Sequence, residues 1–283
     1  PARRRRAVEP DAAVALADAG AFDLDRAHEG SHTADGRPIQ ALLETIGLGY
    51  QGSSIRSSAV AMNKTITKTV LKSHGLPVAE EVAVTREMDV EEAIKRIEGR
   101  LPFPLFIKPA HLGSSVGAGR AHNREELREA IARGLLVDSS ILVEPMLVGR
   151  ELTCGVLVQD GTDDVVPLPS ILIEPIGHEF FDFESKYTPG HNRELCPAPI
   201  SSELEKTLRE LAMDCHRALE CRDISRTDFI VTESGPVILE VNTLPGLTEA
   251  SLIPKSAAAA GMPFDELIQR LVKRAIARTT GTG

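Results

Sequence analysis

The spacing of apolar residues along the chain predicts a series of amphipathic helices. After Pro199, apolar residues recur every three or four positions up to Leu219, which is typical of a helix with one buried face. A helical stretch from Asn63 ends at Gly75, shortly before Pro77. The predicted helices cover residues 12–19, 41–44, 63–74, 89–97, 123–136, 202–219 and 263–277. Three of them begin with capping-box pairs, which are Asp89 and Glu92, Asn123 and Glu126, and Ser202 and Glu205.

Short apolar runs bounded by proline or glycine predict strands between these helices. The runs cover residues 103–108, 141–144, 152–158 and 165–173, and a hairpin spans residues 227–242. The polar segment from Gly177 to Pro199 is long for a connection, and such segments are often lids. The chain therefore has a mixed α/β (α+β) pattern. We expect three domains, at residues 1–61, 62–148 and 149–283.

The predicted hairpin contains the most informative polar residues. If residues 233–235 form a three-residue loop, Asp228 lies opposite Glu240, and Asn242 shares their face. The other face is then apolar, with Phe229, Val231, Val237, Leu239 and Val241. Two close carboxylates repel each other unless a cation lies between them, and oxygen ligands suit magnesium. The alternative is a hairpin with one hydrated face and a chance pair of acidic residues.

Residues on either side of the hairpin extend this interpretation. Arg226 precedes Asp228 by two positions, so it faces the same side and is suited to bind a phosphate or an oxyanion. After the hairpin, Gly246 allows a backbone N–H to approach a substrate closely, and Ser251 can donate to a carboxylate. For Pro245-Gly246, an ordinary turn is the alternative.

A second group of residues is typical of phosphate binding. Lys108 ends a predicted strand and precedes a loop of small residues, where Ser114 and Ser115 add hydroxyl donors to the backbone N–H groups. The lysine precedes this loop, so the pattern is not a Walker motif.

Other charged residues lie near the predicted strand ends. Lys64 begins the central segment, Glu144 ends a strand, and Glu151 directly precedes the next predicted strand. A carboxylate at a strand end can accept a hydrogen bond from an adenine amino group or a ribose hydroxyl. A solvated surface charge is the alternative for each residue taken alone.

Composition then narrows the class of protein. The formal net charge of the 283 residues is −9, which argues against a nucleic-acid binder. No long apolar run predicts a membrane span or a secretion signal, so we expect a cytoplasmic protein. The four cysteines form no CxxC pair, and we expect free, buried or neutral thiols.

Taken together, the segments resemble the D-alanine–D-alanine ligase family of the ATP-grasp superfamily. The resemblance covers roughly residues 28–275. The matching pieces, in family order, are Gln40–Glu44, Ala61–Lys64 with Lys68, Ile107–Pro109, Gly113–Gly117, Val143-Glu144, Gly149–Glu151, Phe181–Tyr187, Arg226–Asp228, Glu240–Gly246 and Ser251-Leu252. The resemblance implies an ATP-grasp fold, with a partial N-terminal α/β domain and with central and C-terminal α+β domains that clasp ATP.

The resemblance also implies a role for each matching residue. The implied ATP-binding residues are Lys64, Lys108, Ser114, Ser115, Glu144, Leu147, Glu151 and Lys186, with Leu147 against the adenine ring. The implied ligands of two magnesium ions are Asp228, Glu240 and Asn242, and manganese is a possible substitute. The implied catalytic residues are Ser114, Lys186, Tyr187, Arg226 and Gly246, with Lys186 and Tyr187 on the lid. The implied substrate residues are His28, Ser251 and Leu252.

The implied reaction joins two D-alanine molecules in two steps. One carboxylate attacks the γ-phosphate of ATP to give an acyl phosphate, and the amine of the second amino acid then displaces phosphate. The product serves peptidoglycan precursor synthesis. The implied partners are small amino acids and a second copy of the chain in a homodimer, with no nucleic acid and no membrane.

The chain departs from the family pattern at its start. The family's N-terminal glycine-rich turn and its glutamate have no match in residues 1–27, so we expect a truncated or divergent first domain. The loop from His28 to Gln40 has altered spacing, and Asn63 stands where aspartate usually precedes the lysine. Two alternatives therefore stay open. One is a related ligase for a different amino or hydroxy acid, in antibiotic synthesis or resistance, and the other is a catalytically silent nucleotide-binding relative.

Overall fold

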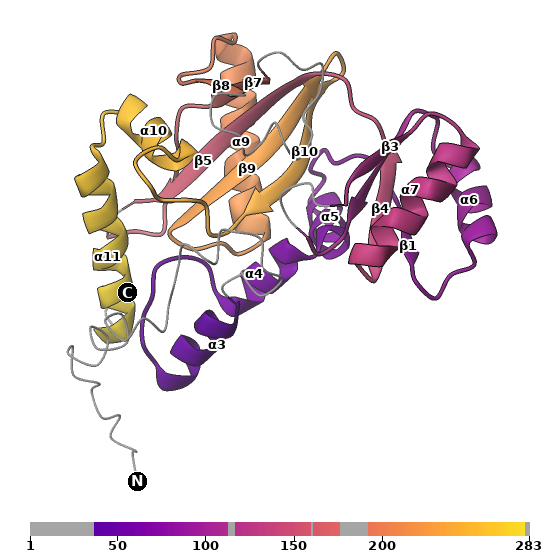
Figure 1. Cartoon of the computed structure of the whole chain (residues 1–283). Helices are drawn as coiled ribbons and strands as arrows, with labels where there is room; N and C mark the ends of the chain where they lie inside the picture. Colours follow the sequence, from indigo (N-terminus) through magenta and orange to yellow (C-terminus); the bar gives the residue numbers. More distant parts are fainter. Residues whose placement is uncertain (1–36, 113–116, 160, 176–191, 281–283) are drawn as a thin grey trace.

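The computed structural model of the chain describes residues 37–112, 117–159, 161–175 and 192–280. It contains two antiparallel sheets with helices packed against them (Figure 1). The helix predicted at residues 12–19 and most of the predicted lid lie outside the described residues.

The smaller sheet is built from the central part of the chain. Its four strands lie in the order β1-β4-β2-β3. Their bounds are β1 Val82–Thr85, β2 Leu105–Pro109, β3 Gly119–Ala121 and β4 Ser140–Pro145. Two helices, α6 (Val90–Glu98) and α7 (Arg124–Val137), share a buried aliphatic core with the sheet. Asp89 and Asn123 cap these helices, and each accepts a hydrogen bond from a backbone N–H of the first turn, so both predicted caps are confirmed.

The larger sheet follows along the chain. Its order is β10-β9-β5-β7-β8, and β6 also pairs with β5. The strands are β5 Arg150–Val158, β6 Val165–Pro167, β7 Ile171–Pro175, β8 Asn192–Leu195, β9 Ile224–Thr232 and β10 Gly235–Asn242. Helix α9 (Ser202–Ala218) packs its apolar side on one face. Helices α10 (Leu252–Ala259) and α11 (Phe264–Thr280) form a second core with Leu157 and Ile224.

In the part of the chain that the structure describes, three helices precede the smaller sheet. They are α3 (Arg37–Ile46), α4 (Ile55–Met62) and α5 (Lys64–Ser73). Helix α5 begins at Asn63, whose side chain accepts from the N–H of Ile66, as the predicted helix start requires. Leu71 of α5 packs into the core of the larger sheet, while the N–H of Lys64 bonds the carbonyl of Ala110 just after β2. Helix α5 therefore contacts both sheets.

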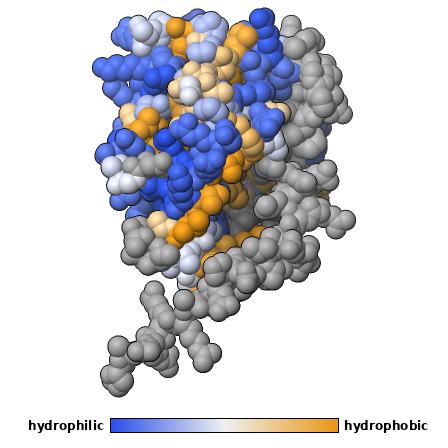
Figure 2. Space-filling view, turned by 90° about the vertical axis from the view of Figure 1, so that its left-hand side faces the viewer, coloured by the Kyte–Doolittle hydropathy of each residue, from blue (hydrophilic) through white to orange (hydrophobic). Residues whose placement is uncertain are grey.

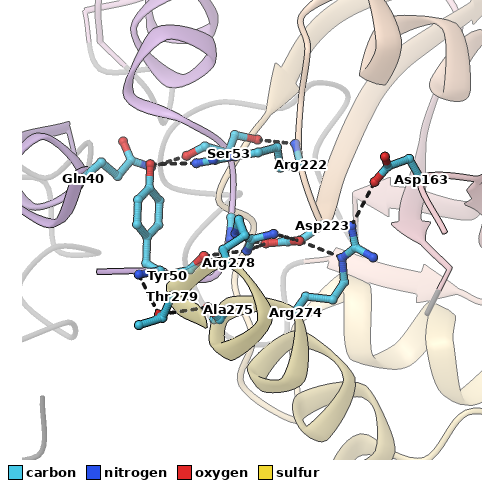
Figure 3. A network of polar contacts seen from close by, with 12 residues as sticks. Gln40, Tyr50, Ser53, Asp163, Arg222, Asp223, Arg274, Ala275, Arg278 and Thr279 are labelled. Carbon is cyan, nitrogen blue, oxygen red and sulfur yellow. Dashed lines mark hydrogen bonds and ion pairs between the residues drawn. The ribbon is translucent and has the colours of Figure 1, made fainter. Parts of the chain in front are cut away.

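A buried ionic network fixes the start of β9 (Figure 3). The carboxylate of Asp223 is fully buried and accepts hydrogen bonds from the N–H of Gly52, from Arg274 and from Arg278. Asp223 has a φ of +59°, a conformation that side-chain-bearing residues rarely adopt. The network ties the α3–α4 connection and α11 to the strand that carries Arg226 and Asp228.

Some predicted elements differ from the structure. The predicted strand at 165–173 is two strands, β6 and β7, because residues 168–170 between them are not in a strand. Ser201 caps α9 and not Ser202, since the Ser201 hydroxyl accepts from the N–H of Leu204. Helix α10 was not predicted, and β8 lies inside the segment predicted to be a lid.

The face that carries α11 is mostly polar, with apolar residues in a narrow oblique band (Figure 2). Val272 and Ile276 of α11 are about half exposed. None of the helices in the described ranges is long and apolar enough to cross a membrane.

Candidate active site

The β9–β10 hairpin places Asp228 directly opposite Glu240 on one face of the larger sheet. Glu233 and Ser234 form the turn, so the first pairs of the hairpin follow a two-residue connection. The register then shifts between Ile238 and Glu240, which leaves Leu239 as an extra residue in a β-bulge. The shift brings Glu240 to Asp228 and Asn242 to Arg226.

The predicted pairing of Asp228 with Glu240 is confirmed, but the three-residue loop predicted to cause it is wrong. A two-residue turn alone would place Leu239 opposite Asp228 and turn Glu240 to the other face. The bulge restores the pairing. It also changes the apolar face, since Ile238, and not Val237 and Leu239, joins Phe229 in the core.

Asp228 lies at the centre of a dense polar cluster. Arg226 donates to both of its carboxylate oxygens, through Nε and Nη2, at 2.9 Å each. Asn242 Nδ2 donates at 3.1 Å, and the Thr153 hydroxyl of β5 donates at 2.6 Å. Charge-assisted bonds of this kind are stronger than neutral ones. In this structure, therefore, Arg226 balances the charge of Asp228. The prediction based on repulsion between two carboxylates did not take this arginine into account.

The side chains of this face fit a magnesium ion. Asp228, Glu240 and Asn242 offer carboxylate and amide oxygens, which are the ligands that magnesium prefers. Among the described residues, no group of three or more His, Cys, Asp or Glu side chains is arranged to hold a metal. The fit therefore depends on one or two protein carboxylates completed by oxygens of a ligand, the usual arrangement for magnesium.

Lysines and carboxylates from α5 and the smaller sheet form a second cluster, which interacts with the hairpin through the charges of Lys64 and Glu240. The Glu144 carboxylate of β4 accepts from Lys68 at Oε1 and forms an ion pair with Lys108 Nζ at 2.9 Å through Oε2. Lys68 also contacts Glu81 at 2.6 Å. Lys64 donates to the carbonyl of Leu112 at 2.6 Å. These predicted nucleotide-binding residues, Lys64, Lys108 and Glu144, are brought together in the structure.

Burial and neighbouring charges shift the pKa values of Lys64 and Glu144 in this cluster. Burial lowers the pKa of Lys64. The negative charges of Glu240 and Glu144 act in the opposite direction, and the positive charge of Lys108 adds to the lowering. Burial alone would raise the pKa of Glu144, but the charges of Lys108 and Lys68 and their hydrogen bonds outweigh it and lower that pKa. Glu144 is therefore ionised, and the negative charge of Glu240 on β10 acts on Lys64.

The connection between the two sheets carries two more predicted residues. β4 ends at Pro145 and β5 begins at Arg150, so Leu147 lies on the chain segment that joins the sheets and is half-buried. Glu151 is buried at the start of β5, paired in the ladder with Ile230 of β9. Glu151 and Asp228 thus lie on the same face of the sheet.

The segment after β10 leads back over this face. Gly155 of β5, which pairs with Arg226, has no room for a Cβ because Ile253 of α10 lies against it. Ser251 and Leu252 form the start of α10, beside that contact. The Ser251 hydroxyl lies 2.8 Å from that of Thr248, and half-buried Gly246 precedes them in the same loop. The positive end of α10 therefore lies on the side of the sheet that carries Asp228.

Five predicted site residues lie outside the described residues: His28, Ser114, Ser115, Lys186 and Tyr187. The residues just before Ser114 and Ser115 in the sequence, up to Leu112, are described. His111 Nδ1 lies 2.9 Å from Asp138 Oδ1, and its Nε2 lies 3.0 Å from Asn63 Nδ2. Asn63, which differs from the family pattern, therefore contacts His111 at the start of the predicted loop of small residues.

Three residues that support the site were given no role from the sequence, although two of them, Lys68 and Gln40, lie in segments that resemble the family. Thr153 bonds Asp228 from a neighbouring strand, and no local pattern reveals that pairing. Lys68 follows Lys64 by one helical turn, and this spacing was a signal that it shares the same face. Gln40 of α3 donates to Ser58, which accepts from Thr243 next to Asn242, so a buried chain of hydrogen bonds reaches the hairpin.

Comparisons with known proteins agree with this geometry. A family described as D-ala D-ala ligase C-terminus matches residues 70–273. The chain is 41% identical over 267 residues to the D-alanine–D-alanine ligase of Desulfovibrio desulfuricans, with 93% of this chain and 82% of that relative covered.

Solved structures of similar fold include two ligases. The VanG D-Ala:D-Ser ligase of Enterococcus faecalis is 33% identical, with a TM-score of 0.77, and 86% of this chain and 70% of that chain are covered. The D-alanine–D-alanine ligase of Bacillus anthracis, complexed with ATP, is 29% identical, with a TM-score of 0.73, and 87% and 76% are covered. The described residues thus have the ATP-grasp fold of these enzymes, and the chain belongs to the D-alanine–D-alanine ligase family of ligases.

Proposed function

We propose that this chain uses ATP to join two D-alanine molecules into D-alanyl-D-alanine, with release of ADP and phosphate, for peptidoglycan precursor synthesis in the cytoplasm. The observation that carries the proposal is the paired Asp228 and Glu240 on the hairpin, next to Arg226 and close enough to Lys64 of α5 for the charges of Lys64 and Glu240 to interact. Family membership supplies the reaction type, since relatives of this chain are named D-alanine–D-alanine ligases.

The nucleotide would lie between the two sheets. Lys64 and Lys108 offer positive charge to its phosphates, and buried Glu144 and Glu151 offer acceptors for its adenine or ribose. Leu147, on the connection between the sheets, offers an apolar contact for the adenine ring. Lys186 and Tyr187 are assigned by resemblance alone, whereas Ser114 and Ser115 are assigned by resemblance and by the small-residue sequence that follows Lys108.

The hairpin would bind magnesium through Asp228, Glu240 and Asn242. We propose two ions, with manganese as a substitute, and they would supply positive charge to neutralise the transferred phosphate. Arg226 holds Asp228 through a bidentate contact and presents its guanidinium to the same face. It would stabilise the oxyanion of the second step together with the backbone N–H of Gly246.

The amino acids would bind at the other end of this face. Ser251 and Leu252 begin α10, and a helix N-terminus favours a carboxylate. We propose that they hold the carboxylate of the second amino acid, and that His28 acts on the substrate side. The domain boundaries near residues 61 and 148 and the homodimer belong to the same proposal.

A second candidate is a ligase that takes a different second substrate. The similarity to the VanG D-Ala:D-Ser ligase favours it, because that enzyme has the same fold and is named for D-serine as well as D-alanine. The third alternative, a catalytically silent relative, is disfavoured by the retained cluster of Arg226, Asp228, Glu240 and Asn242.

A panel of amino and hydroxy acids tests the proposal. Purified protein is incubated with ATP, magnesium and each acid, and both phosphate release and product mass are measured. Phosphate release with D-alanine and the mass of the dipeptide are expected. A mixed D-alanyl-D-serine product in excess would favour the second candidate, and no product with any acid would contradict both.

A further inference from the structure

Helix α5 carries a row of lysines on one face. Lys64, Lys68 and Lys72 are spaced four residues apart, so their side chains lie one above another. Each faces an acidic residue from another part of the fold. The charge of Glu240 acts on Lys64. Lys68 contacts Glu144 and Glu81, and Lys72 Nζ lies 3.4 Å from a carboxylate oxygen of Glu81.

Lys68 is the most enclosed of the ion-paired lysines in this row. Its side chain is 3% exposed, against 38% for Lys72. A charged amine in such a position is costly unless it is fully paired. Lys68 meets this requirement with two carboxylates, which come from the residue before β1 and from β4.

Glu144 is shared between two lysines that use different oxygens. Lys68 contacts Oε1, and Lys108 contacts Oε2 at 2.9 Å. The Glu144 side chain is 5% exposed, so it has little access to water. If Lys108 turned towards a phosphate, Glu144 would keep one lysine, and that lysine is Lys68.

We propose that Lys68 is a positioning residue for nucleotide binding: it stays paired with Glu144 and so allows Lys108 to leave that carboxylate for a phosphate. This inference rests on the proposed function, because it requires a nucleotide at Lys108. Lys68 itself does not touch the nucleotide. Its effect is to keep a compensating positive charge beside the buried Glu144 carboxylate when Lys108 leaves it.

The arrangement predicts a penalty that appears only on binding. In a Lys68→Met protein without nucleotide, Lys108 still pairs with Glu144 and Lys72 still lies near Glu81, so the fold is retained. When nucleotide draws Lys108 away, Glu144 loses its last lysine. Affinity for nucleotide therefore falls, while the binding of amino acids, which lies at α10, is unaffected.

Calorimetric titration of the full chain with ADP and magnesium measures this effect. The dissociation constant of Lys68→Met should rise at least about tenfold over wild type, and the KM for D-alanine should stay within about twofold. The matched control is Lys72→Met, one helical turn away, whose ADP affinity should not change. Melting temperatures establish that each protein is folded, and Lys68→Gln replaces Lys68→Met if the latter is not.

A double-mutant cycle separates positioning from a general structural effect. In a Glu144→Gln background there is no carboxylate to leave unpaired, so adding Lys68→Met should change the ADP dissociation constant by less than about twofold. An equal loss in both backgrounds, or wild-type affinity in Lys68→Met, overturns the positioning role alone. Failure of wild type to bind ADP at all overturns the proposed function, and this inference with it.

Discussion

Asp228 and Glu240 lie directly opposite each other on neighbouring strands because one extra residue, Leu239, is accommodated in a β-bulge between them and the turn. Two acidic side chains in that relationship repel each other. In this structure, Arg226 compensates Asp228 and the field of Lys64 acts at Glu240. The pair thus remains available to share a cation that arrives with a phosphate ligand.

Replacing Glu240 by glutamine should abolish most of the turnover. The change keeps the shape of the side chain but removes the charge that would hold a magnesium ion, and we expect kcat to fall by about 100-fold or more. Phosphate release measured at saturating ATP and D-alanine gives the value. Glu233→Gln, in the exposed turn of the same hairpin, is the control and should be as active as wild type. Near-normal turnover in Glu240→Gln would show that the metal assignment is wrong.

The Thr153 hydroxyl should tune how tightly Asp228 takes up magnesium. Thr153→Val preserves shape but removes a 2.6 Å hydrogen bond to a buried carboxylate, a bond of about 1.5–3 kcal/mol. We expect the magnesium concentration for half-maximal activity to rise by about tenfold. Thr227→Val changes the same residue type on the opposite face of β9, and its magnesium dependence should match wild type. Identical magnesium curves for both variants would contradict this role of Thr153.

The network at Asp223 should contribute strongly to stability. Asp223→Asn keeps a side chain that tolerates the left-handed backbone, but it leaves Arg274 and Arg278 without a negatively charged buried partner. Breaking a buried ion pair costs about 3–5 kcal/mol, which corresponds to a fall of about 10 °C in Tm. Calorimetric melting measures it. Asp163→Asn removes a fully exposed partner of Arg274 and should leave Tm unchanged, and equal melting of both variants would contradict the assignment.

Buried His216 should make the protein less stable in mild acid. Burial lowers its pKa from 6.5 to about 4, and its Nδ1 lies 2.8 Å from the Ser225 hydroxyl. Because the folded pKa lies below the unfolded one, the unfolded state binds the proton more readily. The stability is complete above pH 6.5 and is lost as the pH falls towards 4, by about 3 kcal/mol in all.

Urea unfolding between pH 7 and pH 4 measures that loss. His216→Gln lacks the titrating ring, so its free energy of unfolding should decline less over this window than that of wild type. His122→Gln alters an exposed histidine and should follow the wild-type curve. Parallel curves for wild type and His216→Gln would show that His216 does not contribute.

Local sequence signals predicted the parts of the fold that depend on neighbouring residues. The caps at Asp89 and Asn123 and the start of α5 at Asn63 are local, since a side chain bonds an N–H two or three positions away. The pairing of Asp228 with Glu240 was also predicted, although from the wrong turn. The bulge at Leu239 has no local signature, because sheet packing selects it.

Contacts between distant segments could not be predicted in this way. Lys68 and Glu144 are separated by 76 positions, and Thr153 and Asp228 by 75, so only the assembled sheets bring them together. Helix α10 was missed because it is short and contains Pro254 in its first turn, which is compatible with a helix start but also with a loop. The roles of Lys64 and Leu147 came from resemblance to a family and not from any pattern in their surroundings.

The location of a bound divalent ion tests the central claim most directly. Crystals grown with ADP and manganese would be measured for anomalous scattering, which identifies the ion independently of water. We expect the signal between the carboxylates of Asp228 and Glu240, beside the ADP phosphates. Ordered ADP with the manganese signal elsewhere, or with those carboxylates bound only by protein groups, would contradict the account.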